Sequence, residues 1–334
     1  MKRDANAGEG TPAPDASSGS SAHSSSPANG VAIDVHGMTK RFGSLVAVDH
    51  IDLRVASGEI CGFLGPNGSG KTTFIRMLCG LLRADEGSGT CLGFEVMRES
   101  EEIKRQVGYM TQKFSFYEDL SIAENLDFVA RMYSVPRRRE AVTASLERLG
   151  LADRKNQLAG NLSGGWKQRL ALAACMIHEP KLLLLDEPTA GVDPKARREF
   201  WEQIHELAAS GLTCLIATHY MDEAERCTRL AYIGYGKLLT QGTVDDVVAQ
   251  AHLTTFEVTG PKLQELAEKL RREPGVQQAV AFGSALHVSG DDATALERAI
   301  EPYRKPPYVW SEAASSLEDV FIHLMGGLKD NARA

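Results

Sequence analysis

The segment Gly65-Pro-Asn-Gly-Ser-Gly-Lys-Thr72 decides the fold, because it fits the pattern GxxxxGK[ST] in full. The short apolar stretch Glu59–Leu64 precedes it, and an amphipathic stretch from Gly70 to about Leu81 follows it. The pattern has physical meaning where a strand comes before the turn and a helix comes after it. We therefore expect the chain to pass from a buried strand, through this turn, into the first turn of a helix.

The composition of this turn suits the binding of a phosphate chain. Its glycines let the backbone curve so that the N–H groups point inward, and the N-terminus of the following helix adds its positive end. The lysine is then expected to reach the β- and γ-phosphates, and the threonine hydroxyl to bind magnesium. A chance glycine-rich loop is the competing interpretation, which the flanking strand and helix disfavour. The predicted nucleotide contacts are Gly65, Pro66, Asn67, Gly68, Ser69, Gly70, Lys71, Thr72 and Thr73.

A second apolar stretch, Leu182–Leu185, leads into the two carboxylates Asp186 and Glu187. In open α/β sheets, ligands bind beyond the carboxyl ends of the strands. We expect Asp186 to hold magnesium and Glu187 to act as general base toward water, a role worth about 10²–10⁴-fold in rate. Alone, such a pair would more often cap the following loop. Beside the glycine-rich turn, it predicts a site of phosphate hydrolysis.

The segment Leu162-Ser-Gly-Gly-Trp-Lys-Gln-Arg-Leu170 predicts a second anion-binding surface. Ser163 stands at the expected start of a helix, and Gly164 and Gly165 leave the backbone bare beside it. One chain thus carries two phosphate-binding surfaces far apart in sequence. This layout predicts a head-to-tail homodimer with ATP between the subunits.

Strands and helices alternate around these motifs, which predicts an α/β fold: a P-loop NTPase core with a largely parallel sheet. Closely spaced early strands predict an added antiparallel β subdomain, and a helical stretch broken by proline predicts a helical subdomain. The expected strands are Val31–Val35, Leu45–Val55, Lys181–Leu185 and Leu212–Thr218, and the expected helices are Gly164–Ile177, Lys195–Ala209 and two within Leu120–Glu147, broken at Pro136.

The glycine-rich turn, the serine–glycine segment and the acidic strand, in this arrangement, resemble the ATP-binding subunits of ABC transporters over about Val31 to Val248. The resemblance implies an ATPase that uses ATP and magnesium and works as a homodimer. The serine–glycine segment of one subunit would close on the γ-phosphate held by the other. It also implies a separate transmembrane permease as partner, and a peripheral location on the cytoplasmic face of a bacterial inner membrane.

Further residues gain roles only through this resemblance. Asp193 matches the loop that couples the two sites, His219 the switch histidine that contacts the γ-phosphate, and Gln112 the glutamine that senses magnesium and faces the membrane partner. Phe42 matches the aromatic that stacks on adenine. The implied catalytic residues are Lys71, Glu187 and His219, and the implied magnesium site is Thr72, Gln112 and Asp186.

Two positions depart from the family pattern. Trp166 stands where glutamine is common, and Phe42 stands where tyrosine is more usual. Since Ser163 and Gly165 are expected to make the phosphate contacts, we expect activity to survive with Trp166. Stacking on adenine needs only the face of an aromatic ring, so Phe42 is expected to serve.

The chain beyond about Ala251 alternates short strands and helices again. The expected strands there are Thr254–Thr259, Gln277–Phe282 and Leu286–Val288, and the expected helices are Lys262–Arg272, Asp292–Glu301 and Ser315–Met325. We expect an ATP-binding domain over 31–250 and a C-terminal α/β accessory domain over 251–334, with a regulatory or dimer-supporting role. The segment Ala314–Leu324 resembles the tails of bacterial subunits that serve export permeases, often multidrug exporters. The spacing of Leu317, Val320, Phe321 and Leu324 predicts a helix face packed on the accessory domain.

Composition limits the remaining possibilities. The 334 residues carry a net charge of −7, so a nucleic-acid partner is not expected. No apolar run approaches the ~18 residues that a membrane-spanning helix needs. Residues 1–30 are of low complexity and predict a disordered tail, and the six cysteines, without a CxxC pair, predict buried thiols. The alternatives are a soluble ABC-type ATPase acting on ribosomes or DNA, which the single P-loop disfavours, and a non-hydrolysing scaffold.

Overall fold

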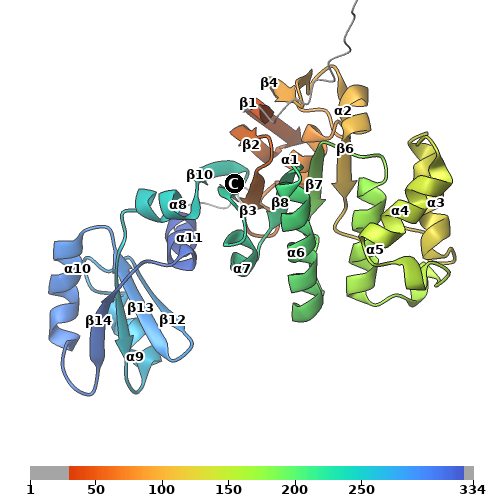
Figure 1. Ribbon diagram of the computed structural model, residues 1–334. Coiled ribbons are helices and arrows are strands. Elements are labelled where there is room, and N and C mark those ends of the chain that lie inside the picture. Colours follow the sequence, from red (N-terminus) through yellow and green to blue (C-terminus); the bar gives the residue numbers. More distant parts are fainter. Residues whose placement is uncertain (1–29, 327–334) are drawn as a thin grey trace, which may run out of the picture.

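The computed structural model describes residues 30–326 of the chain, so the prediction for residues 1–30 lies almost wholly outside the described part (Figure 1). Its centre is a six-stranded sheet with the strand order β10-β9-β3-β8-β7-β6. All neighbouring pairs are parallel except β10 with β9. The bounds are β3 Ile60–Leu64, β6 Val107–Met110, β7 Leu182–Asp186, β8 Thr213–Thr218, β9 Arg229–Gly234 and β10 Lys237–Gly242.

The strands of this sheet are apolar on both faces because both faces are covered. Along β7, Leu183 and Leu185 belong to one hydrophobic cluster, while Leu182 and Leu184 belong to another. The first cluster includes α5 (Gly164–Met176) and α6 (Pro194–Ala209), and the second includes α1 (Lys71–Leu78). This is the physical reason for continuous apolar runs in parallel strands, and it confirms the predicted α/β core.

The early strands form a separate antiparallel sheet with the order β2-β1-β4-β5, as expected. Strand β1 (Val31–Phe42) pairs with β2 (Leu45–Ala56) through a tight turn, and also with β4 (Glu86–Cys91), which pairs with β5 (Phe94–Glu95). Helix α2 (Ser100–Gln106) follows and was not predicted. The hairpin between β1 and β2 places Phe42 at its tip.

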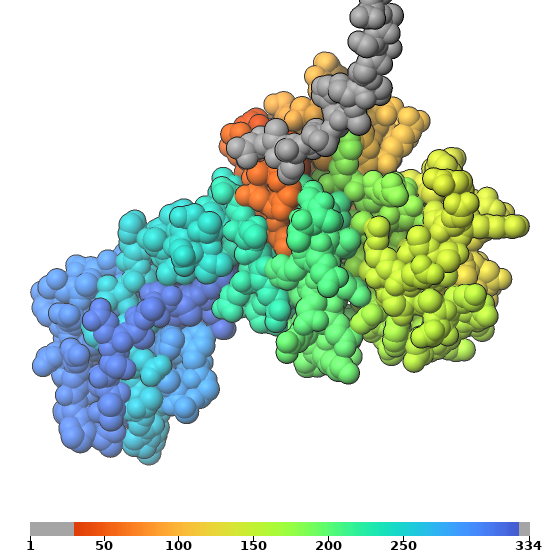
Figure 2. Space-filling model, in the orientation of Figure 1, coloured from red at the N-terminus to blue at the C-terminus, as the bar shows by residue number. Residues whose placement is uncertain are grey.

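The helical subdomain contains α3 (Ile122–Met132) and α4 (Arg138–Arg148), separated at the predicted proline, followed by the 3-10 turns η1 (Ala152–Arg154) and η2 (Ala159–Asn161). Helix α3 begins in a capping box in which Ser121 and Glu124 exchange hydrogen bonds. Figure 2 shows the residues around 120–150 as a lobe at one end of the molecule, with the C-terminal residues at the other end.

The C-terminal residues form an antiparallel sheet with the order β12-β13-β11-β14 and its own hydrophobic cluster. The expected strands and helices are present, but β14 was not predicted because its side chains are mostly exposed and lack an apolar pattern. The connecting helices α7 (Met221–Ala224) and α8 (Val244–Gln250) were not predicted either. The bounds are β11 Thr254–Thr259, α9 Leu263–Leu270, β12 Gln278–Phe282, β13 Ala285–Gly290, α10 Ala293–Ile300, η3 Glu301–Tyr303, β14 Val309–Ala313 and α11 Leu317–Gly326.

Helix α11 corrects one prediction. Its apolar side chains Leu317, Val320 and Phe321 pack into the hydrophobic cluster that includes α5 and α6, and not onto the hydrophobic cluster of the C-terminal sheet. The ring of Phe321 stacks on Tyr232 of β9 at 4.0 Å between centroids, and α11 lies beside α8 (Figure 1). Helical spacing shows that one face is buried but does not identify its partner. The polar side, through Asp319, contacts His287 of the C-terminal sheet at 3.0 Å.

Candidate nucleotide site

The glycine-rich turn joins β3 to α1 and is held tightly by its surroundings. The Gly65 N–H donates to the carbonyl of Thr218 at 3.3 Å. A Cβ at Gly65 would lie 2.2 Å from the carbonyl oxygen of Ile233, and one at Gly70 would lie 2.2 Å from that of Ala47. Gly70 also has a φ of 102°, which side-chain-bearing residues rarely adopt. Glycine is therefore required at both positions, and the loop backbone stays open toward the ligand.

Lys71 lies at the centre of this turn with 4% of its surface exposed. Its Nζ donates to the carbonyls of Gly65 at 2.7 Å and Pro66 at 3.0 Å, and lies 3.7 Å from Oε1 of Glu187. Burial lowers the pKa of Lys71, and the carboxylates of Glu187 and Asp186 oppose that shift. A phosphate would add negative charge at the same ammonium group and favour its charged form.

The candidate magnesium site pairs Thr72 with Asp186. The Thr72 hydroxyl donates to Oδ1 of Asp186 at 3.0 Å, and burial raises the pKa of that carboxyl. Among the described residues there is no group of three or more His, Cys, Asp or Glu side chains that could hold a metal. Magnesium is usually bound through one or two carboxylates, substrate phosphates and water. A hydroxyl beside one buried carboxylate fits this chemistry.

Glu187 is the point where the other predicted residues meet. Gln112 donates through Nε2 to Oε2 of Glu187 at 2.8 Å, and Nδ1 of His219 lies 3.4 Å from Oε1. Glu187 is 8% exposed and has a φ of 48°, a left-handed conformation that costs on the order of 1–3 kcal/mol outside glycine. The structure thus brings together Lys71, Gln112 and His219 around one carboxylate.

The serine–glycine segment lies apart from this cluster. Ser163 is the exposed N-cap of α5 and makes no side-chain cap hydrogen bond. A Cβ on Gly165 would lie 2.6 Å from Cβ of Ala196, so the first turns of α5 and α6 are in close contact. Asp193 caps α6 by accepting from the Ala196 N–H at 3.0 Å. Gly164 is exposed too, so this region forms an open surface distinct from the hydrogen-bonded cluster at Glu187.

Phe42 and Trp166, the two departures from the family pattern, each lie beside positively charged side chains. Phe42 is 50% exposed at the tip of its hairpin, where the Lys40 ammonium lies 5.6 Å from the ring centroid. Trp166 lies against two guanidinium groups, those of Arg154 at 4.7 Å and Arg169 at 5.0 Å. An exposed ring suits a base platform, whereas the half-buried Trp166 contacts Arg169 of its own helix and Arg154 of η1.

The sequence did not predict that the side chains of Tyr220 and Arg197 pack beside His219. The ring of Tyr220 lies 4.1 Å from that of His219, and the Arg197 guanidinium lies 4.4 Å from the centroid of Tyr220. Arg197 also approaches the buried Glu223. No spacing rule links these positions, because they come from α6, the loop after β8 and α7.

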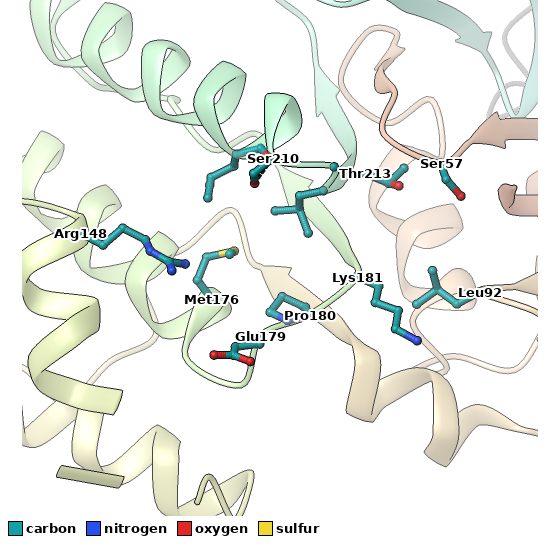
Figure 3. Close-up of a pocket in the computed structure, with 12 residues that line it drawn as sticks. Ser57, Leu92, Arg148, Met176, Glu179, Pro180, Lys181, Ser210 and Thr213 are labelled. Atoms are coloured by element: carbon teal, nitrogen blue, oxygen red, sulfur yellow. Dashed lines mark hydrogen bonds between the residues drawn. The ribbon is translucent and has the colours of Figure 1, made fainter. Parts of the chain in front are cut away.

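A separate pocket of about 400 Å³ lies at the opposite edge of the sheet (Figure 3). Figure 3 shows Arg148 and Met176 on one side of it and Ser57 and Leu92 on the other. Lys181, just before β7, and Thr213, the first residue of β8, line it, whereas Asp186 is the last residue of β7 and Glu187 follows it. Because a five-residue strand spans roughly 16 Å, this pocket is distinct from the nucleotide site.

The fold and the site together define the class. A glycine-rich turn between a buried strand and a helix, an enclosed lysine, and a serine/threonine–aspartate pair at the carboxyl ends of parallel strands are the parts of a P-loop nucleoside triphosphatase. A sequence model described as "ABC transporter" matches residues 48–190. The chain belongs to the ABC transporter ATP-binding family, which relatives of 34–36% identity that match about nine-tenths of its length establish.

Several curated relatives extend over most of the chain. A Nod factor export ATP-binding protein of Rhizobium sp. (strain N33) is 36% identical over 301 residues, 89% of this chain and 97% of that protein. A daunorubicin/doxorubicin resistance ATP-binding protein of Streptomyces peucetius is 34% identical over 90% of this chain and 94% of its own. A "Probable multidrug ABC transporter ATP-binding protein" of Escherichia coli (strain K12) is 43% identical over 221 residues, and the match spans only 38% of its length.

Solved structures agree with this assignment. An ATP-binding cassette of an ABC transporter, in its ADP conformation, superposes with a TM-score of 0.59 at 26% identity, over 65% of this chain and 92% of that one. A subunit of the cbiONQ ABC transporter complex of Clostridium perfringens gives a TM-score of 0.61 at 26% identity, over 73% and 97%. The part of the chain that the structure describes contains no helix long and apolar enough to cross a membrane.

Proposed function

We propose that the protein hydrolyses ATP to drive export through a separate membrane permease. The observation that carries this proposal is the convergence of Lys71, Gln112 and His219 on Glu187, next to the Thr72–Asp186 pair. Relatives that match nearly the whole chain are named as export or drug-resistance ATP-binding proteins. The permease would select the cargo, because the permease would make the contacts with the transported substrate.

The geometry supplies the chemistry of hydrolysis mainly through charge and position. The Lys71 ammonium and the N-terminus of α1 oppose the charge of the transferring phosphoryl group. Thr72 and Asp186 would hold magnesium, which supplies further charge neutralisation when bound. The carboxylate of Glu187 accepts a proton from the attacking water, while Gln112 and His219 orient that carboxylate.

A homodimer completes the site. Ser163 and Gly164 are exposed at the start of α5, and neither is hydrogen-bonded to the glycine-rich turn of its own chain. A second copy arranged head to tail would bring its Ser163 hydroxyl and helix N-terminus to the γ-phosphate. ATP is then buried between two copies and its hydrolysis separates them, so binding energy and opening are linked.

The permease would contact the surface that follows Gln112. Exposed apolar side chains gather there and on α3: Tyr117 is 51% exposed and Phe128 39%, with their rings 5.2 Å apart edge to face. Leu158 and Met132 are also exposed. Apolar groups left in water in one region are typical of a protein-binding surface. Binding there would hold the protein on the cytoplasmic face of a bacterial inner membrane.

The partner is tested by affinity purification from detergent-solubilised membranes. A tagged Glu187→Gln variant, with ATP and magnesium, should retain a stoichiometric polytopic membrane protein, identified by mass spectrometry. The matched control Lys71→Ala, purified in the same way, should not bind ATP. Comparing the amount of membrane protein recovered with the two variants shows whether the partner's binding depends on nucleotide. Recovery of ribosomal proteins, or of the protein alone from the soluble fraction, would refute the transporter assignment and favour a soluble ABC-type ATPase.

A further inference from the structure

A buried carboxylate outside the nucleotide site is connected to the residues beside His219. Glu223 of α7 is 1% exposed. The hydroxyl of Thr189, two residues beyond Glu187, donates to Oε1 of Glu223, and Nε of Arg197 on α6 lies 3.7 Å from the same oxygen. The other oxygen, Oε2, has no hydrogen-bond partner among the described residues. A buried carboxylate with so few partners depends on the nearby positive charge.

Arg197 carries this connection to the nucleotide site. Its side chain is only 21% exposed, and its guanidinium lies over the ring of Tyr220 at 4.4 Å. Tyr220 in turn packs against His219, with 4.1 Å between the ring centroids, and His219 faces Glu187 at 3.4 Å. Each step is a contact between neighbouring side chains. A continuous chain of side-chain contacts thus runs from Glu223 through Arg197 and Tyr220 to His219.

Arg197 also lies one turn after the start of α6. Its N–H donates to the carbonyl of Asp193 at 2.9 Å, and Asp193 caps the same helix through the Ala196 N–H. The first turn of α6 is in contact with the first turn of α5 near Gly165. A shift of this turn would move Arg197 with it. Arginine suits this position because its planar group can stack on a ring and face a carboxylate at once.

Nη1 of Arg197 also donates to Oδ2 of Asp222 at 3.3 Å, so two carboxylates of α7 face this guanidinium. We propose that Glu223 is a positioning residue for ATP hydrolysis: its buried charge, with Asp222, holds Arg197, and Arg197 holds Tyr220 and thereby the His219 ring against Glu187. The first turn of α6 and the switch histidine then move as one unit. This inference rests on the proposed ATPase function. It assigns Glu223 and Arg197 no contact with ATP, water or metal.

The test measures kcat, the Kd for ATP and the melting temperature of Glu223→Gln in the full-length protein. Misplacement of a catalytic side chain by about 1 Å can cost on the order of 10²-fold, so we expect kcat to fall about ten- to a hundred-fold while the Kd for ATP stays the same. Arg197→Lys should behave alike. The matched control is the exposed pair on the same helix, Arg198 and Glu202, 3.1 Å apart, where Arg198→Ala should leave kcat unchanged.

A double variant separates positioning from simple loss of stability. If Glu223 acts through Arg197, Glu223→Gln combined with Arg197→Lys should lower kcat no further than either alone. Tyr220→Phe, which keeps the ring, should retain activity, whereas Tyr220→Ala should lose it. Should Glu223→Gln fail to fold, the kcat of Tyr220→Ala still tests the proposal, because Tyr220 is only partly buried. An unchanged kcat in Tyr220→Ala would overturn the proposal.

The outcomes distinguish this inference from the proposed function. If the wild type does not hydrolyse ATP, the proposed function fails and this inference fails with it. If the wild type hydrolyses ATP and Glu187→Gln does not, but Glu223→Gln matches the wild type, only this inference is overturned. Losses in kcat that simply add between Glu223→Gln and Arg197→Lys would overturn it as well.

Discussion

Replacement of Phe321 by alanine tests whether α11 belongs to the ATP-binding core. Phe321 is 2% exposed and stacks on Tyr232 with 15° between the ring planes. A buried aromatic side chain covers about 150–250 Å², which at about 25 cal/mol/Å² corresponds to roughly 4–6 kcal/mol of transfer free energy. Alanine keeps the Cβ, so we expect a loss of about 3–5 kcal/mol.

Because α11 packs on the core through one apolar face, part of this loss should appear as local detachment before the whole protein unfolds. Hydrogen–deuterium exchange should speed up in peptides covering α11 and α8, and urea unfolding should give the loss in free energy. Leu324→Ala, a half-buried position on the same helix, is the control, with an expected loss of about 1 kcal/mol. A loss below about 1 kcal/mol for Phe321→Ala, with unchanged exchange in α8, would refute the packing argument.

Three further predictions concern the nucleotide site and its surroundings. Gly70→Ala, at a φ of 102°, should weaken ATP binding about ten- to a hundred-fold in a fluorescent-nucleotide titration, through strain of about 1–3 kcal/mol; wild-type affinity would contradict this. Burial raises the pKa of Asp186, so its charge destabilises the nucleotide-free protein above the folded pKa, and the penalty vanishes below about pH 4. Asp186→Asn should therefore raise the melting temperature at about pH 8 but not near pH 4. An equal rise in melting temperature at both pH values would contradict the proposed destabilising effect of the Asp186 charge. The same variant should lose magnesium-dependent hydrolysis. Trp166→Ala should cost about 1–2 kcal/mol in urea unfolding, from two cation–π contacts, and leave turnover largely intact, whereas a loss as large as that of a catalytic variant would place Trp166 in the site.

The core of the fold could be predicted from the sequence because its signals are local. The turn Gly65–Thr72 specifies its own strand and helix, and the parallel strands are buried on both faces, so they are apolar throughout. Strand β14 is largely exposed, and α2 is a short helix with a single buried side chain, Ile103, so neither has such a signal. The destination of α11 depends on tertiary packing, which helical spacing does not encode.

The candidate site divides in the same way. Lys71 and Thr72 follow from their own motif, but the approach of Gln112 and His219 to Glu187 depends on which strands are neighbours. The family resemblance supplied those two residues, and the sheet order β8-β7-β6 supplies the physical reason. Glu223 had no signal of either kind, since its role follows only from contacts made in three dimensions.

The most direct test of the account is ATP turnover by the purified protein and its Glu187→Gln variant, with molecular mass measured in parallel. We expect magnesium-dependent turnover in the wild type. Glu187→Gln should bind ATP, lose turnover by about 10²–10⁴-fold and accumulate as an ATP-bound dimer. Turnover near that of the wild type in Glu187→Gln would contradict the account, because it would remove the carboxylate at which Lys71, Gln112 and His219 meet from the chemistry.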